Sequence, residues 1–308
     1  MKLALVGQLG AAERQAWMEA LQQALPEAQW VEAAPGAEVD VALVANPPPG
    51  QLRELKGLRL IQSLWAGVDR LLADPTLPEG VPIARMVDPA MSAAMAETAL
   101  WAVLSLQRGF FDYARQQREG VWRVLPQRCA DEVRVTVLGL GEMGLSAARR
   151  LEAQGYRVQG WSARPRREPG IDCVHGEEAL PGLLSRSDIV VNLLPLTPTT
   201  RGLFNAERLA LLPEGACLVN LARGGHVVEA DLLAALDAGR LRHAVLDVFQ
   251  TEPLPADSPF WNHPRVTLLP HAAALTDARS AAGIAAGNVR AVMAGGTLAH
   301  LVERGRGY

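Results

Sequence analysis

The sequence has few cysteines and no long uncharged apolar run, and both shortages narrow the class of protein. Its three cysteines, Cys129, Cys173 and Cys217, lie far apart and are odd in number, so they predict no disulfide framework and fit a reducing compartment. No uncharged apolar stretch approaches the roughly 18 to 20 residues that cross a bilayer. The apolar N-terminus could open a signal peptide, but glycines interrupt it early. We therefore expect a cytoplasmic protein without a membrane partner.

The chain also lacks an excess of charge of either sign. Its 30 Lys and Arg and 33 Asp and Glu leave a formal net charge of −3, and the two signs are interleaved. This distribution favours a small-molecule substrate over nucleic acid or a membrane surface. Five of the six histidines show no metal-ligand spacing and are expected to be structural or exposed, so we predict no metal. They are His175, His226, His243, His263 and His300.

Short apolar runs, by contrast, are abundant and alternate with amphipathic stretches. The first series occupies residues 3–6, 41–46, 58–64 and 82–86, and the second residues 133–139, 156–162, 189–195, 216–222, 243–249 and 266–270. Continuously apolar runs between helical patterns predict parallel strands buried on both faces. With 308 residues, two domains are expected. The predicted fold class is α/β.

A long pattern rich in alanine, leucine and methionine separates the two series. It predicts one helix from residue 91 to about residue 117. Such a helix would be mainly a core element. Its length also suits a strut between two domains or part of a dimer interface.

The segment GLGEMG opens the second series, between a predicted strand and a predicted helix. Gly139 would allow a tight turn, Gly141 would let a pyrophosphate approach the backbone, and Gly144 would permit close helix–strand packing. The alternative is an ordinary glycine-rich turn, but the strand and helix around it favour a dinucleotide site at the helix N-terminus.

The end of the next strand bears on which dinucleotide is bound. NAD sites place an acid there for the ribose 2′-hydroxyl. This chain has Trp-Ser-Ala-Arg-Pro-Arg-Arg at residues 161–167, with no acid before Glu168. Ser162, Arg164 and Arg167 could hydrogen-bond a 2′-phosphate. A solvated basic loop is the alternative, and NADPH is favoured over NADH.

Three residues of the second half suggest the chemistry. Arg223, Glu252 and His271 each follow a predicted parallel strand, at the edge where open α/β sheets bind ligands. Reduction of a 2-oxo acid needs a cation for the carboxylate and carbonyl, and an acid that protonates the oxygen as hydride arrives. A carboxylate beside a histidine stabilises the imidazolium and fixes the tautomer. A single histidine is more often structural, so the prediction depends on the set.

The order of GLGEMG, LPLTPTTRGLFN, LVNLARGGHVVEADLLAAL, AVLDVFQTEPLP and LLPHAAALT resembles the D-isomer-specific 2-hydroxyacid dehydrogenase family, over about residues 60–276. The family's catalytic Arg, Glu and His fall on Arg223, Glu252 and His271. The resemblance implies two Rossmann- or flavodoxin-like domains with parallel sheets. The substrate (catalytic) domain would be discontinuous, over residues 1–98 and 275–308, and the dinucleotide-binding domain would span residues 99–274. A homodimer is also implied.

The resemblance further implies two sets of binding residues. The segment SLWAGVD matches the loop whose backbone N–H groups hold the substrate carboxylate, although a plain turn capped by Asp69 would look the same. The expected substrate set is Trp65, Ala66, Gly67, Val68 and Arg223; Trp65 would line the pocket or belong to the core. The expected cofactor set is Gly139, Gly141, Met143, Gly144, Ser162, Arg164, Arg167, Pro195, Leu221, Ala222 and Asp247.

Two departures from the common family pattern indicate which branch of the family this sequence resembles. The segment VDPAMSAAMAET stands where many members have Gly-Tyr, and three alanines follow His271 where many have Gly-Ser or Gly-Gly. With the arginine loop, these features resemble the glyoxylate/hydroxypyruvate reductase A branch. The expected function is NADPH-preferring reduction of glyoxylate or hydroxypyruvate to the D-2-hydroxy acid. The alternatives are a dehydrogenase of a larger 2-hydroxy acid and a dinucleotide-sensing binding protein, because corepressors resembling the family keep the same three residues.

Overall fold

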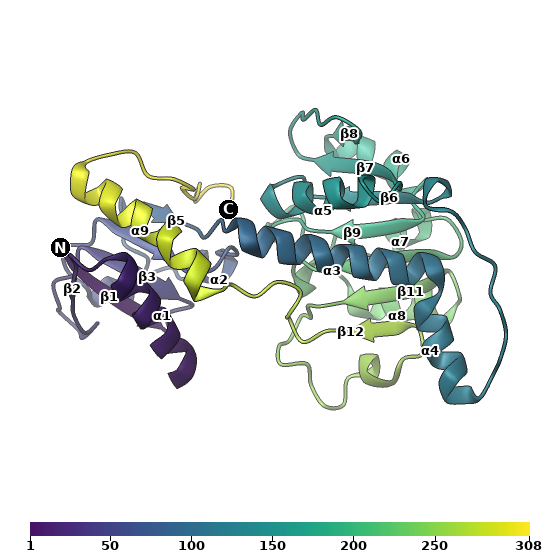
Figure 1. Cartoon of the computed structure of the whole chain (residues 1–308), viewed down its shortest axis with the longest axis horizontal. Helices are drawn as coiled ribbons and strands as arrows, with labels where there is room; N and C mark the ends of the chain where they lie inside the picture. The colour runs from purple at the N-terminus through teal and green to yellow at the C-terminus, as the bar shows by residue number, and fades with distance from the viewer. The chain divides into compact units, whose positions relative to one another are not determined.

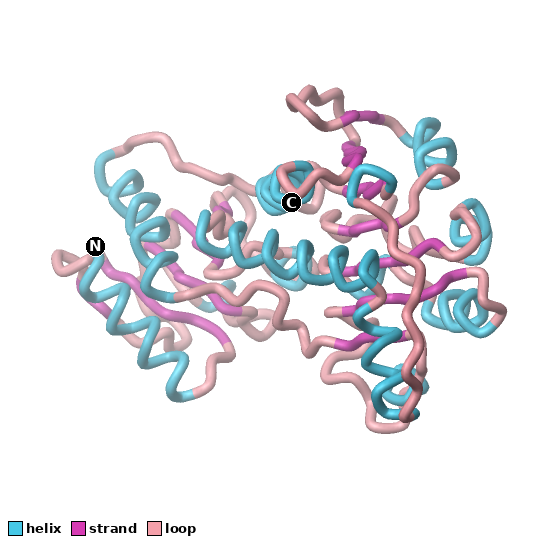
Figure 2. The backbone as a smooth tube through the Cα atoms, turned by 45° about the vertical axis from the view of Figure 1, so that its right-hand side comes forward, coloured by secondary structure: helices cyan, strands magenta, loops and turns pink.

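The computed structural model describes all 308 residues and divides into two compact units. Unit 1 comprises Met1–Met91 and Thr276–Tyr308, and unit 2 comprises Ser92–Leu275. Each unit holds one parallel sheet, drawn as magenta strands in Figure 2, with helices packed against it. The predicted α/β class with two parallel sheets is confirmed, and unit 1 is built from two separate stretches of the chain.

The sheet of unit 1 has five parallel strands in the order β2-β1-β3-β4-β5. This is the flavodoxin-like order, in which the strand order reverses between β1 and β3. The strands are β1 (Lys2–Gly7), β2 (Gln29–Trp30), β3 (Val41–Ala45), β4 (Leu60–Ser63) and β5 (Ile83–Ala84). β3 and β4 are buried along their whole length, which explains why they are apolar without alternation.

Helical elements cover both faces of this sheet. α1 (Ala11–Ala24) and α9 (Ala278–Ala294) lie side by side on one face, as Figure 1 shows. Trp17 and Leu21 of α1 are one turn apart and fully buried, and α9 packs through a row of alanines. The core on the opposite face includes residues of the 3-10 turn η1 (Leu52–Glu54) and of α2 (Asp69–Leu72).

The sheet of unit 2 has seven parallel strands in the order β12-β11-β10-β9-β6-β7-β8. The strand order reverses between β6 and β9, which is the switch point where Rossmann-like sheets bind dinucleotides. The strands are β6 (Arg134–Leu138), β7 (Arg157–Ser162), β8 (Asp172–His175), β9 (Ile189–Asn192), β10 (Ala216–Asn220), β11 (Leu241–Leu246) and β12 (Val266–Leu268).

Two cores flank this sheet. α3 (Pro89–Arg108) and α5 (Glu142–Glu152) contribute to one core, and α6 (Leu180–Leu184), α7 (Ala206–Leu211) and α8 (Glu229–Asp237) contribute to the other. Val137 of β6 points into the first core and its neighbour Leu138 into the second, because successive side chains of a strand face opposite sides. Short 3-10 turns occur at η2 (Ala130–Glu132), η3 (Glu177–Ala179), η4 (Gly224–His226) and η5 (Pro259–Asn262).

The prediction of one helix from residue 91 to about residue 117 is wrong. α3 ends at Arg108, and a separate helix α4 (Phe110–Glu119) follows Gly109. Gly109 has φ 70°, a left-handed conformation that glycine adopts without steric cost. α3 is long and apolar enough to cross a membrane by length and composition, a test that core helices of soluble proteins also pass.

Candidate active site

The glycine-rich turn joins β6 to α5 at the switch point of the second sheet. Gly139 has φ 97°, and a Cβ at this position would lie 2.7 Å from the carbonyl oxygen of Leu193. A Cβ on Gly144 would lie 1.7 Å from the carbonyl oxygen of Gly139, so the helix and the turn approach too closely for any side chain. Gly141 precedes α5 and has no atom within 4 Å of the place where a Cβ would stand. The N-terminus of α5 therefore has open space beside Gly141, whereas Met143 in its first turn is partly buried and packs against the core.

The basic loop after β7 leaves two guanidinium groups unpaired. Ser162 is the last residue of β7, and its hydroxyl donates to the carbonyl oxygen of Arg164 at 2.7 Å. Arg164 and Arg167 are both exposed, and neither guanidinium makes a hydrogen bond or an ion pair within the chain. Two cations are therefore available to an anionic ligand at the end of β7.

The acid of this loop is already neutralised by arginines. Glu168 accepts from Arg166 and from Arg149, each at 2.9 Å, and the hydrogen bonds from these two arginines lower the pKa of its carboxyl. Arg166 also donates to the carbonyl oxygen of Leu140 in the glycine-rich turn. The one carboxylate near the expected 2′-phosphate position is thus occupied.

Two buried asparagines connect the loops after β9 and β10. The Nδ2 of Asn192 donates to Oδ1 of Asn220 at 2.9 Å, and Nδ2 of Asn220 donates to the carbonyl oxygen of Arg223 at 3.0 Å. The backbone N–H of Ala222 also donates to Asn220, and that of Leu221 donates to the carbonyl oxygen of Asn192. These bonds fix the chain immediately before Arg223.

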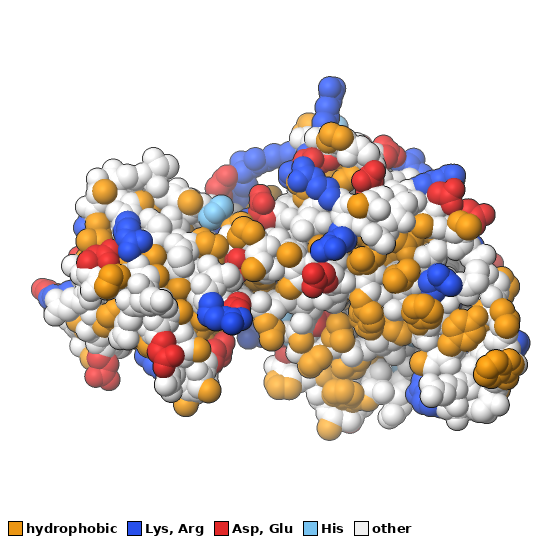
Figure 3. Space-filling model, viewed as in Figure 1, with side chains coloured by type: hydrophobic (Ala, Val, Ile, Leu, Met, Phe, Trp, Pro, Cys, Tyr) orange, Lys and Arg blue, Asp and Glu red, His pale blue; other side chains and the backbone are white.

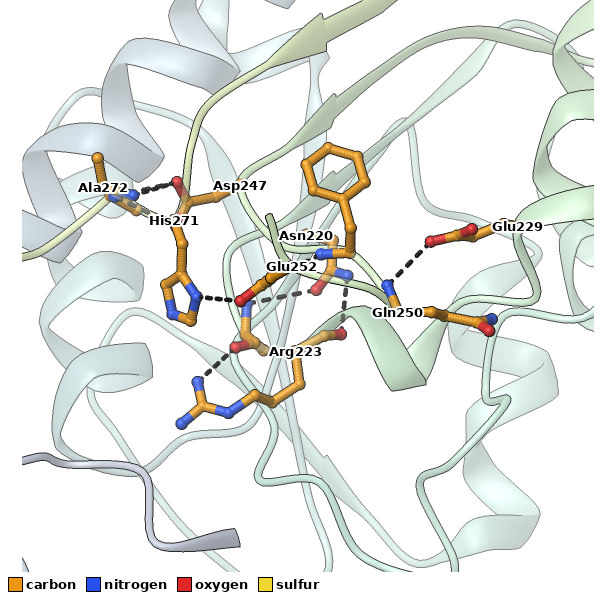
Figure 4. Close-up of polar contacts among 11 residues, drawn as sticks. Asn220, Arg223, Glu229, Asp247, Gln250, Glu252, His271 and Ala272 are labelled. Atoms are coloured by element: carbon orange, nitrogen blue, oxygen red, sulfur yellow. Dashed lines mark hydrogen bonds and ion pairs between the residues drawn. The ribbon is translucent and has the colours of Figure 1, made fainter. Parts of the chain in front are cut away.

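Arg223 follows β10 in an extended conformation, with φ −146° and ψ 144°. Its Nη1 donates to the carbonyl oxygen of Ala222 at 2.7 Å. A Cβ on the next residue, Gly224, would lie 1.9 Å from the backbone carbon of Phe249, so only glycine lets this turn contact the loop after β11. That contact brings the loops of Arg223 and Glu252 together (Figure 4).

Glu252 and His271 form a hydrogen-bonded pair. Oε2 of Glu252 lies 2.8 Å from Nδ1 of His271, and Oε1 accepts from the backbone N–H of Phe249 at 3.0 Å. The glutamate is mostly buried, with 21 % of its side chain exposed, whereas the histidine side chain is 48 % exposed. Because Nδ1 faces the carboxylate, Nε2 is the nitrogen left to act on a substrate. Figure 4 shows the side chains of Arg223, Glu252 and His271 pointing toward one another.

Asp247 anchors the segment that carries His271. Its carboxylate accepts from the backbone N–H of Ala272 at 2.7 Å and of Ala273 at 3.1 Å, and its carbonyl oxygen accepts from the N–H of His271 at 2.8 Å. His271 has φ 54°, a conformation that side chains rarely adopt without such support. Burial raises the pKa of the Asp247 carboxyl, and the two backbone donors act in the opposite direction. No local pattern in the sequence predicts this anchoring contact.

Comparison with known proteins decides the family. The profile of "D-isomer specific 2-hydroxyacid dehydrogenase, NAD binding domain" matches residues 100–273. The chain belongs to the D-isomer specific 2-hydroxyacid dehydrogenase family. It is 42 % identical over 299 residues to glyoxylate/hydroxypyruvate reductase A of Serratia proteamaculans (strain 568), which covers 95 % of this chain and 96 % of the relative.

Solved structures of the family are similar over the whole chain. A D-isomer specific 2-hydroxyacid dehydrogenase from Xanthobacter autotrophicus Py2, in complex with NADPH and MES, has a TM-score of 0.95 and 44 % identity, covering 100 % of this chain and 99 % of its own. An NADPH-dependent glyoxylate/hydroxypyruvate reductase from Sinorhizobium meliloti, in complex with NADP and sulfate, has a TM-score of 0.93 and 34 % identity, with the same coverage.

In this member of the family, the loop expected to hold the substrate carboxylate lies in unit 1, after β4. The backbone N–H groups of Ala66, Gly67 and Val68 make no hydrogen bond within the chain. Trp65 is half-buried and packs edge-on against Trp17, with ring centroids 6.2 Å apart. The three N–H groups are therefore available to an anion, and Trp65 is at least partly a core residue.

Proposed function

We propose that this protein reduces glyoxylate or hydroxypyruvate with NADPH, yielding the D-2-hydroxy acid from hydroxypyruvate. The observation that carries the proposal is the convergence of Arg223, Glu252 and His271 at the carboxyl ends of β10 to β12, with Nδ1 of the histidine on the glutamate. The Serratia and Sinorhizobium relatives are named as reductases of these two acids, and the Sinorhizobium enzyme is NADPH-dependent.

Each member of the catalytic set has one task in this reaction. NADPH, held by the turn after β6 and the basic loop, would supply a hydride to the carbonyl carbon. The guanidinium of Arg223 binds the substrate carboxylate and carbonyl oxygen, so that negative charge develops beside a cation. His271 donates the proton from Nε2 to that oxygen, and Glu252 stabilises the imidazolium through Nδ1. One hydride and one proton convert the carbonyl group to the alcohol, and the histidine regains its proton from solvent.

The residues around the glycine-rich turn fit a bound dinucleotide. The open N-terminus of α5, with Gly139, Gly141, Met143 and Gly144, would hold the pyrophosphate. Further cofactor contacts are assigned to Ser162, Arg164, Arg167, Pro195, Leu221, Ala222 and Asp247. The two unpaired guanidiniums of this set favour the 2′-phosphate of NADP over the free ribose of NAD.

The remaining assignments concern the substrate and the domains. We assign substrate binding to Trp65 and to the free N–H groups of Ala66, Gly67 and Val68 in unit 1, and to the guanidinium of Arg223 in unit 2. Residues 1–98 and 275–308 would then form the substrate domain, and residues 99–274 the dinucleotide-binding domain. We place the protein in the cytoplasm.

A homodimer is part of the proposal, and exposed apolar side chains in unit 2 support it. Trp101, Phe110 and Trp122 are 40 %, 48 % and 99 % exposed. Figure 3 shows apolar side chains gathered over α3 and α4. Exposed aromatic side chains grouped in this way are characteristic of protein interfaces. Light scattering should give about twice the mass of one chain, and a monomer at micromolar concentration would contradict the dimer.

Steady-state kinetics test the reaction directly. The values of kcat/KM for glyoxylate, hydroxypyruvate and a bulkier acid such as phenylpyruvate should be compared with NADPH and with NADH. We expect the two small acids and NADPH to be preferred. Glycerate formed from hydroxypyruvate should be the D enantiomer by chiral chromatography. A preference for phenylpyruvate would indicate a dehydrogenase of larger acids, whereas NADPH binding without any turnover would indicate a dinucleotide-sensing protein.

A further inference from the structure

A fully buried histidine, His226, lies beneath the proposed site and contacts two of its loops. Its side chain belongs to η4, three residues after Arg223, and is 0 % exposed. Nδ1 lies 3.0 Å from the carbonyl oxygen of Arg223, and Nε2 lies 3.2 Å from the carbonyl oxygen of Pro195. One imidazole therefore joins the turn that carries the proposed substrate cation to the loop after β9, on the cofactor side.

The other donors to these two carbonyl oxygens indicate that Nε2 carries a proton. The oxygen of Arg223 already accepts from Nδ2 of Asn220 at 3.0 Å and from the backbone N–H of His226 at 3.3 Å. The oxygen of Pro195 accepts one further bond, from the hydroxyl of Thr200 at 2.8 Å. Since a carbonyl oxygen has two lone pairs, the oxygen of Pro195 is the one with a lone pair left for the ring. We therefore assign a proton to Nε2 of His226, which donates to the carbonyl oxygen of Pro195 at 3.2 Å.

Backbone hydrogen bonds connect the same two segments at a second point. The N–H of Gly202 donates to the carbonyl oxygen of Gly225, and that of Phe204 donates to the carbonyl oxygen of His226, both at 2.9 Å. These bonds hold the end of η4 that is further along the chain from Arg223. The histidine ring makes the connection at Pro195, three residues after the end of β9, and so constrains the side of the turn on which Arg223 lies.

We propose that His226 is a positioning residue that holds Arg223 in place for catalysis by donating Nε2–H to the carbonyl oxygen of Pro195. This proposal rests on the function proposed above for Arg223. Loss of the bond would leave a buried carbonyl with a missing donor and would allow the turn to shift relative to the loop after β9. The guanidinium would then bind the carboxylate and the developing alkoxide less well. Both KM for the 2-oxo acid and kcat would suffer more than the binding of NADPH, because the proposed pyrophosphate and 2′-phosphate contacts lie on the turn after β6 and on the basic loop.

Three substitutions at one position separate the two ring contacts. The amide nitrogen of His226→Gln reaches about as far as Nε2 and can still donate to Pro195, whereas that of His226→Asn reaches only the position of Nδ1. His226→Leu removes both contacts. We expect kcat/KM for the 2-oxo acid to fall about tenfold in the Asn and Leu variants and to stay within about twofold of wild type in the Gln variant.

A control variant tests whether the Pro195 carbonyl matters by itself. Thr200→Val removes the other side-chain donor to this oxygen without touching the turn that carries Arg223. It should leave KM for the 2-oxo acid near the wild-type value. If Thr200→Val reproduces the defect of His226→Asn, the effect belongs to the loop after β9 and the proposal is wrong.

Folding and function are measured separately in this experiment. All rates are normalised to the NADPH-binding fraction found by fluorescence titration, well below the melting temperature of each variant. A purely structural histidine would lower the melting temperature in all variants and leave normalised kcat/KM unchanged, and that result would overturn the proposal. So would a defect in the Gln variant that the Asn variant lacks. If the Leu variant does not fold, the Gln and Asn pair decides.

Binding of oxamate distinguishes failure of this proposal from failure of the proposed function. Oxamate is an unreactive analogue of a 2-oxo acid, and its dissociation constant from the NADPH complex requires no turnover. We expect it to rise about tenfold in the Asn variant and to stay unchanged in the Gln variant. If the wild type binds oxamate with this pattern but turns over no 2-oxo acid, the proposed function fails and the positioning role stands. Equal oxamate affinity in all variants would exclude the positioning role.

Discussion

Two regions of unit 2 differ in whether their charged side chains have hydrogen-bond partners within the chain. In the loops after β11 and β12, Glu252 is hydrogen-bonded by Phe249 and His271, and Asp247 is hydrogen-bonded by the two residues after His271. In the basic loop after β7, the guanidinium groups of Arg164 and Arg167 are exposed and make no hydrogen bond or ion pair within the chain. The first region is organised before any ligand arrives, whereas the second offers free charge to one.

This difference follows from what each region is proposed to do. Groups that act on reacting atoms must be held at a fixed position, because reorientation during the reaction would raise the barrier. Groups that neutralise the phosphate of a cofactor need only be available, since the ligand itself completes their hydrogen bonds. We therefore expect substitutions in the first region to change kcat, and substitutions in the second to change the affinity for the cofactor.

The largest expected effect is that of His271→Ala. Removal of the proposed proton donor should lower kcat for the 2-oxo acid by about 10²- to 10⁴-fold, the usual contribution of general acid catalysis. The NADPH dissociation constant, measured by fluorescence, should stay near wild type because the basic loop is unchanged. His300→Ala, at an exposed histidine of unit 1, is the matched control and should retain activity. A His271→Ala enzyme with a normal kcat would remove this residue from the mechanism.

A smaller loss is expected for Arg223→Lys. Lysine keeps the charge but lacks the planar fork that binds a carboxylate through two parallel hydrogen bonds. Loss of one charge-assisted bond, worth about 1.5 to 3 kcal/mol, should lower kcat/KM for the 2-oxo acid by about one to two orders of magnitude. Both KM and kcat should contribute, whereas NADPH binding should not change. Retention of most of kcat/KM in this variant would mean that Arg223 does not contact the substrate.

The sequence predicts the elements of this fold well where a strand is apolar throughout, and poorly elsewhere. β3, β4 and β9 are fully buried and their runs are unmistakable. β8, with no buried residue, and the two-residue β2 have no such run. The break between α3 and α4 was missed because a single glycine is tolerated inside a helix, and only its φ of 70° shows that Gly109 ends one.

The residues of the site also divide into those that the sequence predicts and those that it does not. Arg223, Glu252 and His271 stand in recognisable motifs, and their positions after parallel strands could be predicted. The bond between Asp247 and the residues after His271 joins positions about 25 residues apart, and the contact of His226 with Pro195 spans 31 residues. Local patterns carry no information about such pairs, because they depend on the register of neighbouring strands and on the shape of two loops.

The basic loop is tested by replacing its unpaired arginines. Arg164→Ala and Arg167→Ala should each raise KM for NADPH by about tenfold, because exposed charge-assisted bonds contribute less than buried ones, and should leave KM for NADH nearly unchanged. Arg157→Ala, at an exposed arginine at the other end of β7, is the matched control. A wild-type enzyme that uses NADH as efficiently as NADPH would show that this loop does not recognise the 2′-phosphate.

The smallest expected effect is a change in pH dependence in Glu252→Gln. The wild-type carboxylate lies 2.8 Å from Nδ1 of His271 and stabilises the protonated ring, whereas the amide carries no charge. Reduction needs the protonated histidine, so the pH at which reduction is half lost should move to lower values in the variant. Oxidation of the hydroxy acid needs the neutral histidine, so it should begin at lower pH as well. The activity at low pH should stay within about tenfold of wild type, since the proton donor itself remains.

A second carboxylate provides the control for this pH shift. Glu229 accepts a hydrogen bond from the backbone N–H of Gln250 at 2.9 Å, and no hydrogen bond or ion pair joins it to His271. Glu229→Gln removes a charge close in sequence to η4. It also weakens a loop contact comparable to that between Glu252 and Phe249. Any change in its pH profile therefore measures the effect of loop anchoring alone. We expect its profiles for reduction and oxidation to overlay those of wild type. If both variants shift equally, the shift comes from the loop, and if neither shifts, Glu252 does not control the protonation of His271.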